Sequence, residues 1–217
     1  MLKADLHVHS AYSFDCRTSL QGIISACQKR GINCIAVADH ASAEGGLKLQ
    51  GLTSIRVIVA EEVLTPHGEI MGMFLKETVP SPLSAEEAIK RIHGQGGLVC
   101  VPHPYDRLRP SAYNGKDLIA IMPSVDVIEV LNSRSLMPGV SSKAFNLARE
   151  YNKPASAGSD AHTPQEIGNA YVEIPEFTTP QDFLKSLSQG RIVGKQAGLS
   201  VHFASTMAKL KRHKPEE

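Results

Sequence analysis

The sequence predicts an α/β protein in which short strands and helices alternate along one sheet. Two observations lead to this class: apolar runs of strand length recur with helix-like segments between them, and ionisable residues gather where these runs end. At 217 residues the chain has the length of a single barrel or doubly wound sheet. We therefore expect one domain over residues 1–217, built on a largely parallel sheet.

The expected strands are short runs rich in β-branched and other apolar residues. The first four are KADLHVH (3–9), NCIAVAD (33–39), IRVIVAEEV (55–63) and EIMGMFL (69–75). The next four are GLVCVPH (97–103), VDVIEVLN (125–132), PASAGSD (154–160) and AYVEI (170–174). Their alternation with helical segments is typical of βα units.

The expected helices lie between these runs. Helical patterns cover about 18–30, 84–95, 141–151, 179–189 and 203–212. Several begin with Ser or Thr at the N-cap position. Ser84, with Glu87 three residues later, has the spacing of a capping box, which predicts a helix start at this point.

Composition excludes several classes of protein. Hydrophobic residues make up 42% and charged residues 21% of the chain, as in globular proteins rather than disordered or membrane ones. The N-terminus has no apolar leader and no stretch reaches the roughly 18 apolar residues of a spanning helix, so we expect a cytoplasmic protein without a membrane partner. A net charge of +1 gives no strong field for nucleic acid, and the basic run KLKRHK (209–214) is typical of a solvated helix end. We expect no protein partner, and four buried, unpaired cysteines.

The stretch DLHVHS (5–10) is the first sign of a site. Side chains two positions apart on a strand share a face, so Asp5, His7 and His9 are expected to point the same way. Ionisable residues also follow or end the later strands: Asp39 and His40, Glu61 and Glu62, His103, Asn132, Asp160 and His162. The C-terminal ends of strands are where barrels and open α/β sheets build their active sites.

Metal coordination explains this choice of residues. Imidazole and carboxylate groups are common ligands of Zn, Mn and Fe, and several of each suit a centre with more than one ion. Burying so many ionisable groups without cations would be costly. The pattern therefore predicts a metal site at one end of the sheet.

The motifs DLHVHS, ADH, AEE, HP and GSDAH, in this order over residues 5–162, resemble the polymerase and histidinol phosphatase (PHP) family of metal-dependent phosphoesterases. The resemblance implies a distorted (β/α)7 barrel with two or three divalent ions at its C-terminal mouth. Zn, Mn or Fe are the expected ions, with Mg as a further option.

The resemblance also implies a ligand set. His7, His9, Glu62 and Asp160 would hold one ion, Glu62, His103 and Asn132 a second, and Asp15, His40 and His162 a third. Asp5 and Asp39 would accept imidazole N–H groups and so orient the ligands. Asn132 departs from the His or Cys common in the family, and Glu69 stands where many relatives carry His, so we place Glu69 and the neighbouring His67 outside the site.

Two neighbouring acids compete for the bridging position in AEEV. Adjacent residues on a strand face opposite sides, so only one of Glu61 and Glu62 can reach the metals. Alignment with the family's Gly-x-Glu pattern selects Glu62.

The implied activity is hydrolysis of phosphomonoesters of small metabolites or nucleotides by a metal-activated water. Catalytic roles are expected for Glu62, Asp160, His162 and Arg134. Arg107, Arg109 and Lys195 are further candidates for binding phosphate, and the loops 106–117 and 134–142 are expected to set specificity.

Two alternatives remain open at this point. The first is an exonuclease acting on nucleic-acid ends, which the neutral charge and the 5% aromatic content do not favour. The second is a non-catalytic metal-binding scaffold that regulates a partner, which the substitution at Asn132 allows and the intact DLHVHS and GSDAH motifs oppose.

Overall fold

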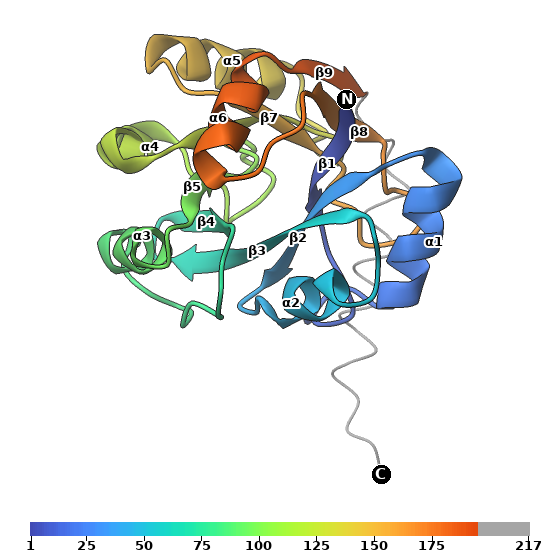
Figure 1. Ribbon diagram of the computed structural model, residues 1–217. Helices are drawn as coiled ribbons and strands as arrows, with labels where there is room; N and C mark the ends of the chain where they lie inside the picture. The colour runs from blue at the N-terminus through green and yellow to red at the C-terminus, as the bar shows by residue number, and fades with distance from the viewer. Residues whose placement is uncertain (195–217) are drawn as a thin grey trace.

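The computed structural model describes residues 1–194, which form one strongly curved sheet surrounded by helices (Figure 1). The strand order is β7-β6-β5-β4-β3-β2-β1-β8-β9. The strands are β1 Leu2–Val8, β2 Cys34–His40, β3 Arg56–Thr65, β4 Gly68–Met73, β5 Leu98–Val101, β6 Val127–Asn132, β7 Ala155–Gly158, β8 Ala170–Ile174 and β9 Arg191–Gly194. The helices are α1 Leu20–Arg30, α2 Glu44–Gln50, α3 Ala85–Gly94, α4 Gly115–Ile121, α5 Val140–Glu150 and α6 Pro180–Ser188, with a 3₁₀ turn at Met122–Ser124.

The sheet closes on itself where the chain leaves β7. The amide of Asp160 donates to the carbonyl of His7, and the amide of His9 donates to the carbonyl of Ala161. These bonds bring the end of β7 beside β1, although the two strands are far apart in the hydrogen-bonded order. The α/β class and the barrel arrangement expected from the sequence are thereby confirmed.

Strand direction differs from the expectation of a largely parallel sheet. The pairs β1–β2, β2–β3, β5–β6 and β6–β7 are parallel, whereas β4 is antiparallel to β3 and β5, and β8 is antiparallel to β1 and β9. Only Pro66 and His67 separate β3 from β4, and so short a connection can join only antiparallel strands. The expectation was therefore wrong for β4 and β8.

The sequence prediction also missed three elements: α2, α4 and β9. Helix α2 begins with Glu44-Gly45-Gly46, and glycine lowers helix propensity. A side chain at position 46 would press on the Val59 backbone, so the glycine allows α2 to lie close against β3. The expected helix 203–212, the basic run 209–214 and Lys195 lie outside the described residues.

Two smaller predictions hold. Ser84 caps α3 by accepting a hydrogen bond from the amide of Glu87, while the Glu87 carboxylate pairs with Arg91. All four cysteines are free and buried. No helix in the described part of the chain is long and apolar enough to cross a membrane.

Alternation along the strands separates an inner from an outer core. On β2, Cys34, Ala36 and Ala38 belong to the core inside the barrel, whereas Ile35 and Val37 pack outside, with residues of α1. The same period continues to the strand ends, so His40 faces inward and Asp39 outward. On β3 it turns Glu62 inward and Glu61 outward.

A bulge in β1 breaks this alternation and corrects the expectation for Asp5. Asp5 pairs with Ile35 and Val8 with Val37, so three residues of β1 span two of β2. Asp5 therefore faces outward, while His7 and His9 reach the inner side of the mouth. Asp5 accepts hydrogen bonds from Ser159 and from the amide of Gly168.

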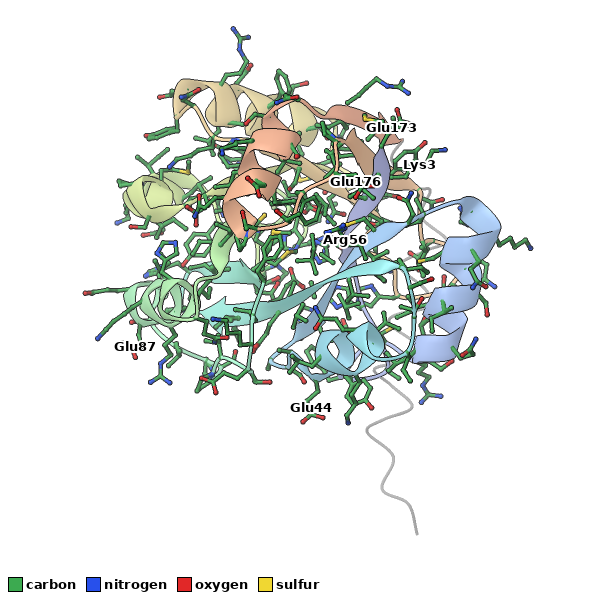
Figure 2. The ribbon with its side chains drawn as sticks, in the orientation of Figure 1. Lys3, Glu44, Arg56, Glu87, Glu173 and Glu176 are labelled. Carbon is green, nitrogen blue, oxygen red and sulfur yellow. The ribbon has the colours of Figure 1, made fainter. Side chains whose placement is uncertain are left out.

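The end of the barrel opposite the ionisable residues is filled by aromatic rings. Phe74, Phe177 and Phe183 pack edge to face, with centroids 5.1–6.0 Å apart. The Arg56 guanidinium, at the start of β3, lies over the Phe177 ring and pairs with Glu176 at 3.2 Å (Figure 2). Of the two ends of the barrel, as far as the described residues show, the polar one is therefore the candidate site.

Candidate metal centre

Buried imidazoles and carboxylates converge at the polar end of the barrel. His7 comes from β1 and His9 from the residue directly after it, His40 and Glu62 from β2 and β3, His103 from the segment after β5, and Asp160 and His162 from the segment after β7. The Nε2 atoms of His7 and His9 lie only 3.2 Å apart. Two ring nitrogens at that distance, each also facing carboxylates, suit a shared cation better than a bond between neutral rings.

Glu62 lies at the middle of this cluster. One carboxylate oxygen is 3.1 Å from His103 Nε2 and 3.4 Å from His7 Nε2, and the other is 3.4 Å from His40 Nδ1. Burial alone would raise the pKa of Glu62, but the charges of His7 and His40 hold it well below its usual range. The two oxygens of Glu62 therefore face different histidines of the cluster.

Glu61 points away from the cluster. Its carboxylate accepts a hydrogen bond of 2.8 Å from the amide of Val79, and burial raises the pKa of Glu61 to about 7. The strand register thus brings Glu62, and not Glu61, to the site, in agreement with the sequence expectation. The bridging role of Glu62 stays a prediction.

Asp160 divides its two oxygens between different neighbours. Oδ1 lies 3.3 Å from His9 Nε2 and 3.5 Å from His162 Nδ1, and it has no hydrogen-bond partner among the described residues. Oδ2 pairs with Arg109. Asp160 has φ +54° and His103 has φ +31°, values that non-glycine residues rarely adopt and that cluster at functional sites.

Asp15 lies between two histidines and forms a second group of possible ligands beside the group around Glu62. Its Oδ2 is 3.1 Å from His162 Nε2 and 3.5 Å from His40 Nε2, and Ser13 donates to its other oxygen. Burial would raise the pKa of Asp15, but hydrogen bonds from His162 and His40 hold it far below its usual value. The three residues expected to hold a third ion are thus brought together.

The donor set fits divalent metal ions. Four groups of donor atoms are compact enough to hold one: His9, Asp15, His40 and His162; His7, Glu62 and His103; His7, His9 and Asp160; His40, Glu62 and Glu69. One buried atom without a hydrogen-bond partner, Asp160 Oδ1, faces the cluster beside His9 and His162. Orphaned polar atoms amid nitrogen and oxygen donors are what a bound cation would satisfy.

Asn132 differs from its expected arrangement. Its amide nitrogen donates to Glu129 at 3.0 Å and to Asp160 at 3.2 Å, while its carbonyl oxygen accepts from the Arg134 amide at 3.0 Å. The oxygen that would bind a metal is therefore engaged by the protein. The ligand role of Asn132 stays a prediction, and it would require the side-chain amide to turn over.

Two acids of this site were missed from the sequence. Glu69, placed outside the site, lies 3.1 Å from His40 Nδ1 and 4.0 Å from His103 Nε2. It stands at the start of β4, and because β4 runs antiparallel, that start lies at the mouth. His67, in contrast, is exposed and lies 3.6 Å from Asp117, as expected of a loop residue.

Glu129 performs the orienting task that was expected of Asp5 and Asp39. Its Oε1 lies 3.1 Å from His7 Nδ1, and its Oε2 accepts from the amide of His103 at 2.7 Å. Asp39 instead accepts hydrogen bonds from the amide and the hydroxyl of Ser10. The expectation failed because Asp5 and Asp39 face outward, whereas Glu129, on the same strand as Asn132, faces inward.

A cavity of about 290 Å³ opens over the cluster. Asp15, His40, Glu69, Asp160 and His162 lie at its wall, together with Asp106, Leu108, Arg109, Pro110, Ser111, Arg134 and Leu136. Both loops expected to set specificity therefore contribute to it. Arg134 is fixed by Glu166 at 3.0 Å, Arg109 pairs with Asp160, and Arg107 is exposed and does not line the cavity.

Comparison with known proteins gives matches along most of the chain. A family model described as PHP domain matches residues 5–98, and one described as PHP-associated matches residues 141–192. An uncharacterized protein of Methanocaldococcus jannaschii is 36% identical over 200 residues, which cover 86% of this chain and 79% of that protein.

Solved structures share the fold at low identity. A two-domain protein from Bacteroides vulgatus, containing a predicted PHP-like metal-dependent phosphoesterase, has a TM-score of 0.73 at 17% identity, over 95% of this chain and 69% of that one. An amidohydrolase from Chromobacterium violaceum, with bound sulfate and no metal, has a TM-score of 0.66 at 18% identity, over 88% and 97% of the two chains. The matching family models, the Methanocaldococcus relative and the ligand-rich mouth of the barrel lead to one conclusion: the chain belongs to the PHP family.

Proposed function

We propose that this protein is a metal-dependent phosphoesterase that hydrolyses phosphomonoesters of small metabolites or nucleotides. The observation that carries the proposal is the position of Glu62 and Asp160, buried amid five histidines directly beneath a cavity with arginines in its wall. Two or three divalent ions held by these residues would supply the charge that activates water and polarises a phosphoryl group.

The protein's own residues prepare the site for such chemistry. Glu129 accepts from His7 Nδ1, so it directs Nε2 of that ring toward Glu62 and Asp160. Glu166 holds Arg134 at the cavity wall, where a guanidinium can donate two hydrogen bonds to one phosphate. The expected catalytic role of His162 rests on its place between Asp15 and Asp160.

The dimensions of the cavity favour a small substrate. A volume of about 290 Å³ lies just below the range for small-molecule sites, which is about 300–1,000 Å³. Two exposed aromatic side chains, Tyr12 and Phe14, lie in the segment after β1, and the centroid of the Phe14 ring is 5.0 Å from that of His40. Two rings are fewer than the succession of rings on which the bases of a single-stranded nucleic acid stack. The Chromobacterium protein of the same fold is described with bound sulfate, a tetrahedral anion like phosphate.

A direct test compares phosphate release from a panel of small phosphomonoesters with the shortening of end-labelled oligonucleotides. Protein reloaded with Mn²⁺ or Zn²⁺ should release phosphate from at least one small ester, and chelated protein should not. Asp160→Asn should lose this activity, whereas Asp117→Asn, at an exposed site, should keep it. Shortening of oligonucleotides without ester hydrolysis would favour an exonuclease, and metal binding without either reaction would favour a regulatory scaffold.

A further inference from the structure

The Asn132 side chain is fully occupied by hydrogen bonds at one corner of the cluster. Both donors of its amide group are used, on Glu129 and Asp160, and its carbonyl oxygen accepts from the Arg134 amide with Arg109 Nη2 at 3.5 Å. The side chain is only 3% exposed, so water cannot readily replace these partners. In this arrangement Asn132 is a donor to carboxylates.

Arg109 supplies a positive charge to the same corner. It comes from the loop after β5, and its Nη1 lies 2.5 Å from Asp160 Oδ2, the oxygen that also accepts from Asn132. Its Nε lies 3.5 Å from Asp106, which fixes the guanidinium from behind. A guanidinium stays protonated throughout the physiological pH range, so this charge is permanent.

Asp160 is thereby divided between two kinds of cation. Oδ2 is neutralised by Arg109, whereas Oδ1 faces His9 and His162 and has no hydrogen-bond partner among the described residues. Only Oδ1 is left to bind a metal ion. A carboxylate already paired on one side has less charge to offer a second ion on that side.

We propose that Arg109 and Asn132 together take the place of a metal ion at this corner of the centre. Asn132 is then a hydrogen-bond donor that holds Asp160 and Glu129, and the Arg109 guanidinium provides the charge that an ion bound beside residue 132 would otherwise provide. This inference rests on the proposed function only in requiring that the remaining ligands bind metal. It predicts a lower metal content than a full set of three ions.

The test counts the metal ions bound by variants of the purified full-length chain. Each variant is stripped with a chelator, reloaded with Mn²⁺, freed of excess metal and assayed for Mn per chain by elemental analysis. Asn132→His alone should bind no additional ion, because Arg109 still occupies the corner. Arg109→Gln combined with Asn132→His should bind about one additional ion per chain. The guanidinium charge has then been removed from this corner, and the new imidazole can bind a metal ion there. Arg107→Gln, an exposed neighbour on the same loop, should match the wild type.

Gain of an ion by Asn132→His with Arg109 intact would overturn the proposal. Asn132→Ala gives an independent check should the double variant fail to fold: an unchanged Mn content supports the proposal, and loss of one ion would show that the Asn132 carbonyl is a ligand. None of these measurements uses ester hydrolysis. Failure of the metal counts with hydrolysis intact would refute this inference alone, and the expected counts without hydrolysis would refute only the proposed function.

Discussion

The two halves of the barrel mouth differ in which end of a strand brings an ionisable residue to the cluster. In the half formed by β1, β2 and β3, neighbouring strands are parallel and the ionisable residues at their C-terminal ends, His7, His40 and Glu62, all face the cluster. In the half formed by β4, β5 and β6, one strand is reversed, and Glu69 enters the cluster from the start of its strand. Strand direction therefore decides which end of a strand can carry a ligand.

The second half also contains two residues that organise the cluster through hydrogen bonds: Glu129, which was not an expected ligand, and Asn132, which was. Glu129 touches the His7 ring and the His103 backbone, and Asn132 joins Glu129 to Asp160. Both halves supply donors, and the second half also holds residues that fix them. Variants in the two halves should consequently differ in the size of their effects.

The largest effect is expected from Glu62→Gln in the parallel half. The substitution removes a charge that lies between His7, His40 and His103, so metal content and hydrolysis should fall together, with kcat reduced more than about 100-fold. KM should change less, because the lost interaction stabilises charge that develops in the transition state. Steady-state kinetics and metal analysis on the same samples measure both quantities.

Glu61→Gln is the matched control for that experiment. Its side chain faces the Val79 amide outside the barrel, so metal content and kcat should stay within about twofold of the wild type. If Glu61→Gln were the inactive variant and Glu62→Gln kept its metal, the inward register of β3 would be wrong.

A smaller effect is expected from Glu129→Gln. Loss of the carboxylate partner of His7 Nδ1 should weaken metal affinity about 10- to 100-fold without removing a ligand. Competition with a metal-binding dye measures this affinity. Wild-type affinity in Glu129→Gln would show that the hydrogen bond to His7 does not position that ring for metal binding.

Glu69→Gln should weaken metal binding by about 10-fold, because Glu69 contacts His40 from the cavity side while Glu62 remains in place. His67→Gln, two residues away and exposed, is the control and should leave binding unchanged. Equal behaviour of the two variants in the same dye competition would show that the reversed strand contributes nothing to the centre.

The smallest effect concerns stability and its dependence on pH. Burial raises the pKa of Glu61 from 4.5 to about 7 in the folded chain, so this group favours the folded state fully below about pH 4.5, and the contribution is lost as pH rises through about 7. Glu61→Gln should therefore raise the free energy of unfolding at pH 8 relative to pH 5 by about 1–3 kcal/mol compared with the wild type. Urea unfolding at the two pH values measures the difference, and parallel curves for the two proteins would contradict it.

Much of this site could be predicted from the sequence because its donors sit at strand ends. Alternation along a strand requires only the sequence, and it predicts that Glu61 and Glu62 face opposite sides, as they do in the structure. The choice of Glu62 as the inward residue came from the resemblance to the family's Gly-x-Glu pattern. The bulge that turns Asp5 outward and the reversal that brings Glu69 in depend on pairing between strands, which local pattern does not reveal. The short connection 64–68 between the strand runs at 55–63 and 69–75 was the available signal for Glu69.

The contacts that Glu129 and Arg109 make with the cluster could not be predicted for a different reason. Glu129 lies inside a run that reads as an apolar strand, and its role depends on His7, 122 positions away in sequence. Arg109 lies in a loop, and its contact with Asp160 follows from how that loop folds back over the mouth. Long-range contacts of this kind are set by tertiary packing, which the sequence pattern does not encode locally.

The most direct test of the central claim is the rate of phosphate release measured against bound metal. Metal-free protein is titrated with Mn²⁺, and the ions bound per chain and the hydrolysis of a small phosphomonoester are determined on each sample. Hydrolysis should be absent without metal and should rise as the sites formed around Glu62 and Asp160 fill, and Glu62→Gln should show neither the binding nor the rise. Full hydrolysis by the metal-free chain, or metal binding and rate that are unchanged in Glu62→Gln, would contradict the account.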